Sequence, residues 1–307
     1  MLGTIDSHRL WSSTQVTAAI NEYSGVLTPN ENWQWCASNG TTYVFTANIA
    51  GTAVSYNGST WTKYAAGGPS PLGPICFNGT TYISVTYGYT YTSYDGITWT
   101  YTTNNLSSGA GYGDPQIVYN GSIYTTGSSW SSNGTTWTAC VVSGGPSPGT
   151  WTFQDIATNG STFVATGGNC IFYSTDGKTF NAQTLPTQIA AGPVTNNGRV
   201  WVVLASGILY YGSYVEGMYS LDGVTWNAMS INNRYSWTSV SANGNKIVAL
   251  TSNQTAITTD GINWTVLGLP NSKTYLGLTA LGNTWISASN PFASLAYGGT
   301  SALTITV

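Results

Sequence analysis

Short runs of apolar residues recur along the chain, and residues typical of tight turns separate them. The clearest example spans residues 154–186, which read QDIATNG, STFVATGG, NCIFYSTDG and KTFNAQTLP. Short runs with Asn-Gly, Gly-Gly or Asp-Gly between them are typical of β-strands. This segment therefore predicts four antiparallel strands, which we name A to D in chain order.

The second strand of each unit is apolar on both of its faces. It contains Phe163-Val164-Ala165 in one unit and a run from Val200 to Leu204 in the next. A strand with one face in water alternates apolar and polar residues, whereas a strand covered on both faces reads as a continuous apolar run. Strand B is therefore predicted to lie between neighbours on both faces of its sheet.

One eight-residue phrase recurs about every forty residues. It reads SYNGSTWT at 55–62, SYDGITWT at 93–100, SSNGTTWT at 131–138, STDGKTFN at 174–181, SLDGVTWN at 220–227 and TTDGINWT at 258–265. An Asn-Gly pair precedes each phrase, and Asn-Gly between apolar runs predicts a two-residue hairpin turn with positive φ at both residues. A period of this length predicts a repeat architecture.

Four antiparallel strands repeated in a ring make a β-propeller. We therefore predict an all-β fold, a seven-bladed β-propeller of four-stranded antiparallel blades over residues 33–307. The seventh unit begins near Tyr275, and residues 296–299 are expected to stand where the phrase has decayed. Residues 1–32 are predicted to be either an N-terminal arm or a ring-closing segment, for example through a strand at 11–17, and the sequence leaves both open.

The repeated phrase resembles the Asp-box, or BNR repeat, of the sialidase-like β-propeller superfamily. The resemblance implies the fold and leaves the activity open, because such propellers carry many functions. Side-chain oxygens of Ser and Asp can accept the free N–H groups of a tight C–D turn. We therefore predict a structural role for the third residue of each phrase: Asn57, Asp95, Asn133, Asp176, Asp222 and Asp260. Two phrases have Asn at this position, which keeps the oxygen acceptor but carries no charge. A structural role allows this replacement, whereas a catalytic role would require the carboxylate.

The chemistry of an enzyme is sparse in this chain. Sialidases of this fold resemble one another in three converging arginines. The chain has Arg9, Arg199 and Arg234, but Arg9 precedes the propeller and Arg199 is expected on the side of the repeated phrases, so these three are not expected to converge. A glycoside hydrolase needs two carboxyl groups within about 5–10 Å. Asp114 and Glu216 lie in loops and would form such a pair only through favourable loop folding, and Asp155 is the only other acid outside the phrases that is expected to approach the central channel. We therefore predict that the protein is not an enzyme. We also expect no cofactor and no metal site.

Composition and charge limit the classes of partner that the sequence predicts. Charged residues make up 6% of the chain and the net charge is −3, with no basic stripe, so nucleic acid is not expected as a partner. No apolar run is long enough to predict membrane insertion. The four cysteines lack metal-ligand spacing and are predicted to be free thiols.

Function is expected on one face of the ring. The A–B and C–D turns share a uniform face, which we call the turn face; the B–C and D–A loops share the opposite, irregular face, which we call the loop face. Exposed aromatic rings beside polar groups suit sugars. The predicted ligand-binding residues all lie on these loops: Tyr87, Tyr89, Tyr112, Asp114, Trp151, Tyr210, Tyr211, Tyr214, Glu216 and Arg234.

A low-charge surface suits a protein outside a cell, whereas unpaired cysteines and the absence of a conventional leader suit assembly in a cytoplasm. A phage virion protein satisfies both. We therefore predict a non-enzymatic tail or capsid surface propeller, assembled in the host cytoplasm and located in the virion. It would bind other virion proteins through the N-terminal arm, and the loop face would recognise a host glycan. The alternatives are a free-standing extracellular lectin and a glycoside hydrolase.

Overall fold

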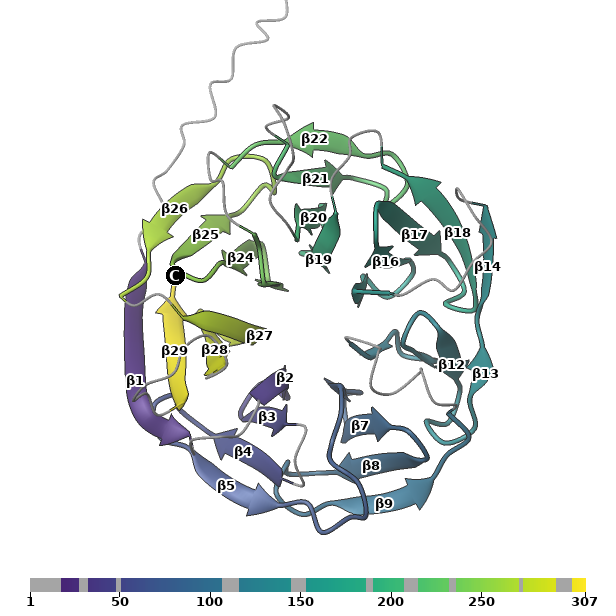
Figure 1. Ribbon diagram of the computed structural model, residues 1–307, viewed down its shortest axis with the longest axis vertical. Coiled ribbons are helices and arrows are strands. Elements are labelled where there is room, and N and C mark those ends of the chain that lie inside the picture. Colours follow the sequence, from purple (N-terminus) through teal and green to yellow (C-terminus); the bar gives the residue numbers. More distant parts are fainter. Residues whose placement is uncertain are drawn as a thin grey trace, which may run out of the picture.

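The computed structural model describes residues 18–27, 33–47, 51–106, 116–144, 153–185, 190–206, 215–231, 236–270, 273–290 and 300–307. Over these residues the chain is all-β, and its seven sheets stand around a central axis as the blades of a propeller (Figure 1). The predicted fold class is therefore confirmed. No helix in the described part of the chain has the length and hydropathy to cross a membrane.

Each blade has its strands in the order A to D from the channel outward. The inner strands A are β2 (Trp33–Ser38), β6 (Ile75–Phe77), β10 (Val118–Tyr119), β15 (Asp155–Thr158), β19 (Ala191–Asn196), β23 (Ser239–Asn243) and β27 (Thr274–Leu281). The strands B are β3 (Tyr43–Ala47), β7 (Tyr82–Thr86), β11 (Tyr124–Thr125), β16 (Phe163–Gly167), β20 (Trp201–Ala205), β24 (Lys246–Leu250) and β28 (Thr284–Asn290).

Strands C and D form the outer half of each blade. The strands C are β4 (Gly51–Ser55), β8 (Tyr89–Ser93), β12 (Ser129–Ser131), β17 (Cys170–Ser174), β21 (Gly217–Ser220), β25 (Gln254–Thr258) and β29 (Thr300–Thr306). The strands D are β5 (Thr62–Ala65), β9 (Thr100–Thr103), β13 (Thr138–Ala139), β18 (Thr179–Thr184), β22 (Asn227–Met229), β26 (Thr265–Gly268) and, in the seventh blade, β1 (Ala19–Leu27).

The core lies between the blades, and strand B explains why it does. Val202 and Val203 are neighbours on β20, and both are fully buried. Val203 packs with Val164 of the preceding blade, whereas Val202 packs with Ile247 of the following blade. Successive side chains of a strand point to opposite faces of its sheet, so a blade between two others must be apolar on both faces, as the continuous run predicts.

The ring is closed by the first described strand. β1 pairs antiparallel with β29, so the sheet of the seventh blade has the order β1-β29-β28-β27 (Figure 1). The Glu22 carboxylate of β1 forms an ion pair with Lys273, just before β27. The closing strand thus lies at Ala19–Leu27, while the 11–17 segment lies outside the described residues.

The prediction that residues 296–299 replace the phrase was wrong. Strand C of the seventh blade is β29, which begins at Thr300. Residues 296–299 themselves lie outside the described residues, but β29 follows them in the chain, so a connection from strand C to strand D would have to come after β29. Because strand D comes from β1, this blade has no C–D hairpin at all.

Like the seventh blade, the fourth blade contains a strand from another part of the chain, and this strand follows the third blade. Its strand β13 is short, and the next residues form β14 (Val141–Gly144), which pairs in parallel with β18 of the fourth blade. The chain changes blade between Cys140 and Val141: the Cys140 N–H donates to Ser128 O, and the Val141 N–H donates to Lys178 O. The fourth blade therefore has five strands, and the added strand links it to its neighbour.

The Asn-Gly turns differ from the two-residue hairpins that the sequence predicts. In five of the six pairs the connection has four residues, as between Ser38 and Tyr43. The Asn side chain governs the turn: Asn39 Oδ1 accepts from the N–H groups of Thr41 and Thr42 at 3.0 and 2.9 Å. Asn therefore serves as a side-chain acceptor of an Asx-turn. Only the turn after Asn243 has two residues.

The repeated phrase forms the C–D turns, and its polar groups are used inside each turn. Asp95 Oδ1 accepts from the N–H groups of Ile97 and Thr98, both at 2.8 Å, while Ser93 Oγ accepts from Gly96 N at 2.8 Å. The Trp99 indole N–H donates to Gly96 O at 3.0 Å. Equivalent backbone contacts recur at the other five third positions: Asn57, Asn133, Asp176, Asp222 and Asp260.

The glycine of the phrase has a backbone conformation and a contact with the preceding blade that require glycine at this position. Gly96 has φ +77°, and a Cβ there would lie 2.4 Å from Val44 Cγ2 on strand B of the preceding blade. The Thr52 hydroxyl of that blade also donates to Gly96 O at 3.0 Å. Only glycine combines this backbone conformation with such a close approach. The C–D turn is therefore also a joint between blades.

Candidate ligand site at the channel mouth

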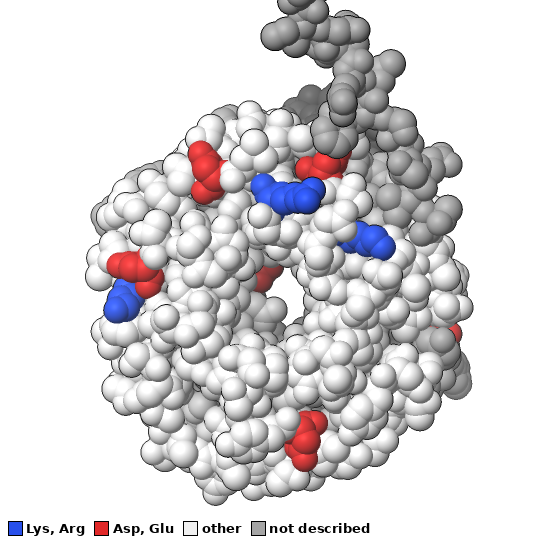
Figure 2. Space-filling view, turned by 180° about the vertical axis from the view of Figure 1, so that it is seen from behind, with Lys and Arg blue, Asp and Glu red and all other residues white. Residues whose placement is uncertain are grey.

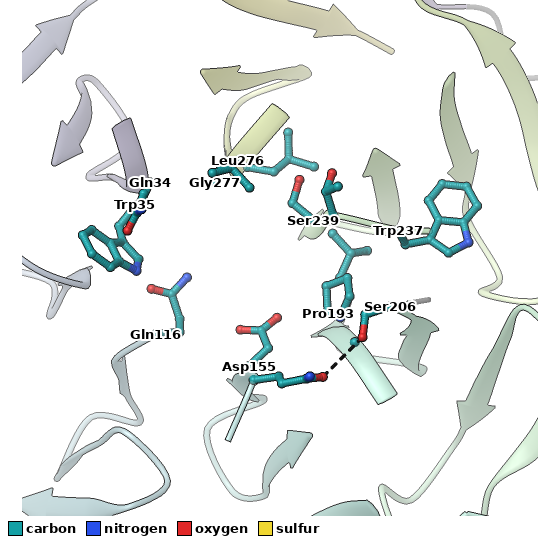
Figure 3. Close-up of a pocket in the computed structure, with 15 residues that line it drawn as sticks. Gln34, Trp35, Gln116, Asp155, Pro193, Ser206, Trp237, Ser239, Leu276 and Gly277 are labelled. Carbon is teal, nitrogen blue, oxygen red and sulfur yellow. Dashed lines mark hydrogen bonds between the residues drawn. The ribbon is translucent and has the colours of Figure 1, made fainter. Parts of the chain in front are cut away.

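The inner strands enclose a cavity of about 450 Å³ at one end of the central channel (Figure 3). Most of its lining residues lie in the first half of strands A or just before them, as Gln116 does before β10 and Thr238 before β23, while Ser206 follows strand B of the fifth blade. Strands A begin at the D–A loops, so the cavity lies on the loop face. This volume falls within the range of small-molecule sites, roughly 300–1,000 Å³.

Backbone irregularities surround the cavity. The pairing register shifts in β2 between Trp33 and Trp35, in β19 between Ala191 and Val194, and in β27 between Leu276 and Leu278. The skipped residues, Gln34, Gly192, Pro193 and Gly277, all line the cavity. Bulges redirect side chains and are frequent beside functional sites. Three of the seven inner strands are thus bent at the same end of the channel.

Asp155 supplies the carboxyl group of the cavity. It is the first residue of β15, it is partly buried, and its carboxyl group points into the cavity (Figure 3). Oδ1 accepts from Ile156 N and Oδ2 accepts from Val194 N, both at 2.9 Å. Loss of solvent raises the pKa of Asp155 to about 7, although the two N–H donors act in the opposite direction. The group is therefore fixed in place and titrates near neutral pH.

Three glutamines from three blades join this carboxyl group. Gln34, Gln116 and Gln154 all line the cavity. Gln154 Oε1 accepts from the Ser206 hydroxyl at 3.3 Å, whereas Gln116 Oε1 is buried and has no partner among the described residues. The Ser239 hydroxyl, on a residue only 8% exposed, is likewise buried without a partner in the described part of the chain. Two residues of the lining thus each have a buried polar atom that the described part of the fold leaves without a partner.

Apolar and aromatic groups complete the wall. Leu276 and Pro193 contribute aliphatic surface. The Trp35 ring lies beside Gln116, while the Trp237 ring is directed away from the cavity (Figure 3). Among the described lining residues Asp155 is the only charged one. The described residues also contain no cluster of metal-ligating side chains.

The wider surface is nearly uncharged. Figure 2 shows lysine, arginine, aspartate and glutamate as isolated spots around the central hollow. The protein has seven basic and ten acidic residues in all. A long-range field that steers charged ligands is therefore weak, and the cavity chemistry has to act at short range.

Three of the predicted ligand-binding residues are among the described residues: Tyr87, Tyr89 and Glu216. Tyr87 is 52% exposed in the B–C turn of the second blade, and Tyr89 packs edge-on against Tyr101 with ring centroids 5.9 Å apart. Tyr91, in the same loop sequence, is fully buried, and its hydroxyl donates to Ser70 O at 2.6 Å. The other predicted positions lie outside the described residues: Tyr112, Asp114, Trp151, Tyr210, Tyr211, Tyr214 and Arg234.

Glu216 is held inside the fold. The residue is 9% exposed, and its Oε2 accepts hydrogen bonds from Ile231 N and from the Ser230 hydroxyl. These contacts tie the start of strand C to the end of strand D in the fifth blade. Neither Glu216, Tyr87 nor Tyr89 lines the cavity.

The sequence contained a signal for this cavity. Gln34, Gln116 and Gln154 each stand four or five residues before the Asn of an Asn-Gly pair, where strand A begins. Only Asp155 was expected near the channel from the sequence, and it does line the cavity. The position of Ser239 carries no such mark, because buried serines are common throughout these blades.

Comparisons with known proteins agree on the fold. No family model matches the chain, and no curated protein matches it. A structure described as YCF48 bound to D1 peptide is 11% identical, with TM-score 0.66 over 94% of this chain and 95% of that one. The WD40 β-propeller domain of Doa1 is 8% identical, with TM-score 0.63 over 94% and 97%. YCF48 from Cyanidioschyzon merolae is 13% identical, with TM-score 0.60 over 94% and 98%. At this identity the similarity concerns the propeller fold alone.

Proposed function

We propose that the protein is a non-enzymatic surface propeller of a phage virion, and that its loop face recognises a host glycan. The observation that carries the proposal is the channel-mouth cavity. A rigid ring presents one fixed carboxyl group, three glutamines and a tryptophan ring around a cavity of about 450 Å³. Polar groups fixed beside aromatic surface suit sugars, which offer hydroxyl groups at their edge and C–H groups on their faces.

The cavity is better suited to binding than to chemistry. Hydrolysis of a glycosidic bond needs two carboxyl groups flanking that bond, whereas the described lining supplies Asp155 alone. Both oxygens of that carboxyl group already accept backbone N–H groups. Such a group is placed to orient a hydroxyl group of a ligand, and we propose no catalytic residue.

The virion location is supported by the surface and by the cysteines. Charged residues make up 6% of the chain, and Cys36, Cys76, Cys140 and Cys170 are all free thiols. Free thiols need no oxidising compartment for folding, which agrees with assembly in a host cytoplasm. We place the contact with other virion proteins in the residues that precede β1.

A host-attachment assay tests this function. In the variant Tyr210→Ala/Tyr211→Ala/Tyr214→Ala, particles should attach to host cells about tenfold or more weakly, since each ring–sugar contact contributes about 0.5–1.5 kcal/mol. The matched control is Tyr56→Ala/Tyr94→Ala, because these tyrosines are 66% and 77% exposed in C–D turns on the turn face. Equal attachment by both variants and the unaltered particle, or absence of the protein from purified particles, would contradict the proposal.

Recognition of a protein segment is a second candidate. The structures that match this chain include a propeller described as bound to a peptide and a WD40 domain. The same loop face would then bind an extended segment of a host surface protein. Treating host cells with a glycosidase separates the two functions, because attachment through a glycan would be lost and attachment through a protein would remain.

A further inference from the structure

We propose that the channel-mouth cavity is the subsite for the terminal sugar of that glycan, and that it accepts an uncharged sugar ring and rejects acidic sugars. The inference rests on the proposed glycan recognition and assigns it to residues that the loop prediction did not include. It is carried by the juxtaposition of the Asp155 carboxyl group with the unused polar atoms of Gln116 and Ser239.

The unused atoms require a hydrogen-bonding partner. A buried polar group without a partner destabilises the fold, and Gln116 Oε1 and Ser239 Oγ are both in this state among the described residues. A hydroxyl group can donate to the amide oxygen and accept from the serine hydroxyl. Gln116 and Ser239 lie on different sides of the cavity (Figure 3), so hydroxyl groups at separate positions of one sugar would be needed to satisfy both atoms.

Asp155 adds the orienting contact. Each carboxylate oxygen accepts one backbone N–H group, and each retains a further lone pair for a ligand hydroxyl group. Because Ile156 and Val194 fix the carboxyl group, no side-chain entropy is lost there when a ligand binds. Two vicinal hydroxyl groups are the ligand chemistry that matches two fixed oxygens.

The remaining wall fits the apolar face of a sugar. Trp35, Pro193 and Leu276 supply apolar surface around the polar cluster. A sugar ring carries C–H groups on its faces and hydroxyl groups at its edge, so one ring can contact both parts of this wall. Trp35 is partly buried against the core of the second blade, which holds its ring in place.

The charge of the cavity determines which sugars are excluded. The described lining contains no lysine, arginine or histidine. Above pH 7, where Asp155 is ionised, the carboxylate of a sialic or uronic acid would meet it without a compensating cation, and like charges at short range disfavour binding. The resemblance of the repeated phrase to sialidase propellers therefore does not extend to a sialic-acid ligand at this cavity.

Titration calorimetry with paired probes tests the inference. The probes are methyl β-glucoside against methyl β-glucuronide, and lactose against sialyllactose. We expect the unaltered protein to bind at least one neutral probe, and to bind its acidic partner about tenfold or more weakly. The variants Asp155→Asn and Gln116→Ala should each weaken the neutral probe by at least about threefold, whereas Gln183→Ala on the outer strand β18 should not.

Melting temperature identifies a variant that has merely unfolded, and Gln116→Ala tests the cavity without touching the carboxyl group. Tighter binding of the acidic probe, unchanged binding in both cavity variants, or no binding of any probe would overturn the inference. If the cavity variants still attach to host cells while the triple tyrosine variant does not, this subsite is wrong and the proposed function stands. If neither set affects attachment, the proposed function fails as well.

Discussion

The Asp155 carboxylate of the fourth blade accepts a hydrogen bond from the backbone N–H of Val194 in the fifth, with an oxygen–nitrogen distance of 2.9 Å. Val194 follows the bulge of β19, and the residue before it, Pro193, has no N–H to donate. One side chain therefore joins two blades at the place where the channel opens. Its pKa of about 7 gives this joint a measurable signature.

Stability should fall as the pH rises from about 4 to about 7. In this range the folded protein holds a proton on Asp155 that the unfolded chain, with its ordinary pKa near 4, has released. We expect a decrease of about 1–3 kcal/mol, since water at the partly exposed group reduces the full linkage value. Urea unfolding between pH 4.5 and 7.5 measures this slope.

The variant Asp155→Asn should remove most of that slope, because an amide does not titrate. Asp222→Asn is the control: hydrogen bonds from Thr225 N and Val224 N lower the pKa of Asp222, so its contribution is lost only when the pH falls below about 4. An unchanged slope in Asp155→Asn would show that another group is responsible.

The C–D turns should require an acceptor and not a charge. Asp95→Ala should lower the free energy of unfolding by about 1–3 kcal/mol, because the N–H groups of Ile97 and Thr98 lose their acceptor. Asp95→Asn should change it much less, since Asn57 and Asn133 make the same contacts naturally. Denaturant unfolding of the two variants is the measurement, and equal losses would mean that the charge matters.

Two glycines with positive φ should respond differently to alanine. Gly96→Ala combines backbone strain with a Cβ 2.4 Å from Val44 Cγ2, whereas Gly79→Ala has φ +95° and no atom within 4 Å of the added Cβ. Strain contributes about 1–2 kcal/mol in both, and the overlap adds about 1–3 kcal/mol in the first alone. Melting temperatures rank the two variants, and the opposite ranking would argue against the joint between blades.

Ring closure should depend on β1. A chain that begins at residue 28 lacks the strand that pairs with β29 and the Glu22 partner of Lys273. We expect lower and less cooperative thermal unfolding together with concentration-dependent aggregation, because the edge of β29 becomes free to pair. A chain that begins at residue 18 serves as the control. Identical melting of the two chains would assign ring closure to the other blades.

The cysteines should be inert in the folded protein. Cys36 and Cys76 are buried, and loss of solvent raises the pKa of both thiols, that of Cys76 to about 12. Thiolates are the reactive form, so a thiol reagent at pH 8 should label neither residue before unfolding. All four cysteines should react in denaturant without a reductant. A disulfide in unreduced protein would contradict both this prediction and assembly in a reducing cytoplasm.

Local sequence patterns predict most of the fold. The continuous run at Val202 and Val203 identifies a strand with neighbours on both faces, and the Asn-Gly pairs place the A–B turns correctly although their length differs. Ring closure by residues 1–32 was one of the two alternatives that the sequence left open. The pairing of β14 with β18 was not predictable, because the two strands belong to different blades and the residues of β14 do not indicate its partner.

The candidate site also combines features that local sequence predicts with features that depend on the assembled fold. The periodic phrase identified Asp95 and its equivalents as turn residues, while the cavity depends on bulges in β2, β19 and β27 that change which side chains reach the channel. A bulge reflects the fit of whole blades around the ring. Gln116 is therefore visible as a residue before strand A, but its unused oxygen emerges only from the assembled blades.

The pairing of β1 with β29 sets an order of events during protein synthesis. Residues 19–27 are made well before their partner at 300–306. At synthesis rates of about 5–20 residues per second, the early strand waits roughly 15 to 55 seconds. Throughout that interval the ring is open and β1 is without its partner. A translation product interrupted before β29 therefore exposes strand edges to other chains, so synthesis of β29 determines whether the whole ring closes.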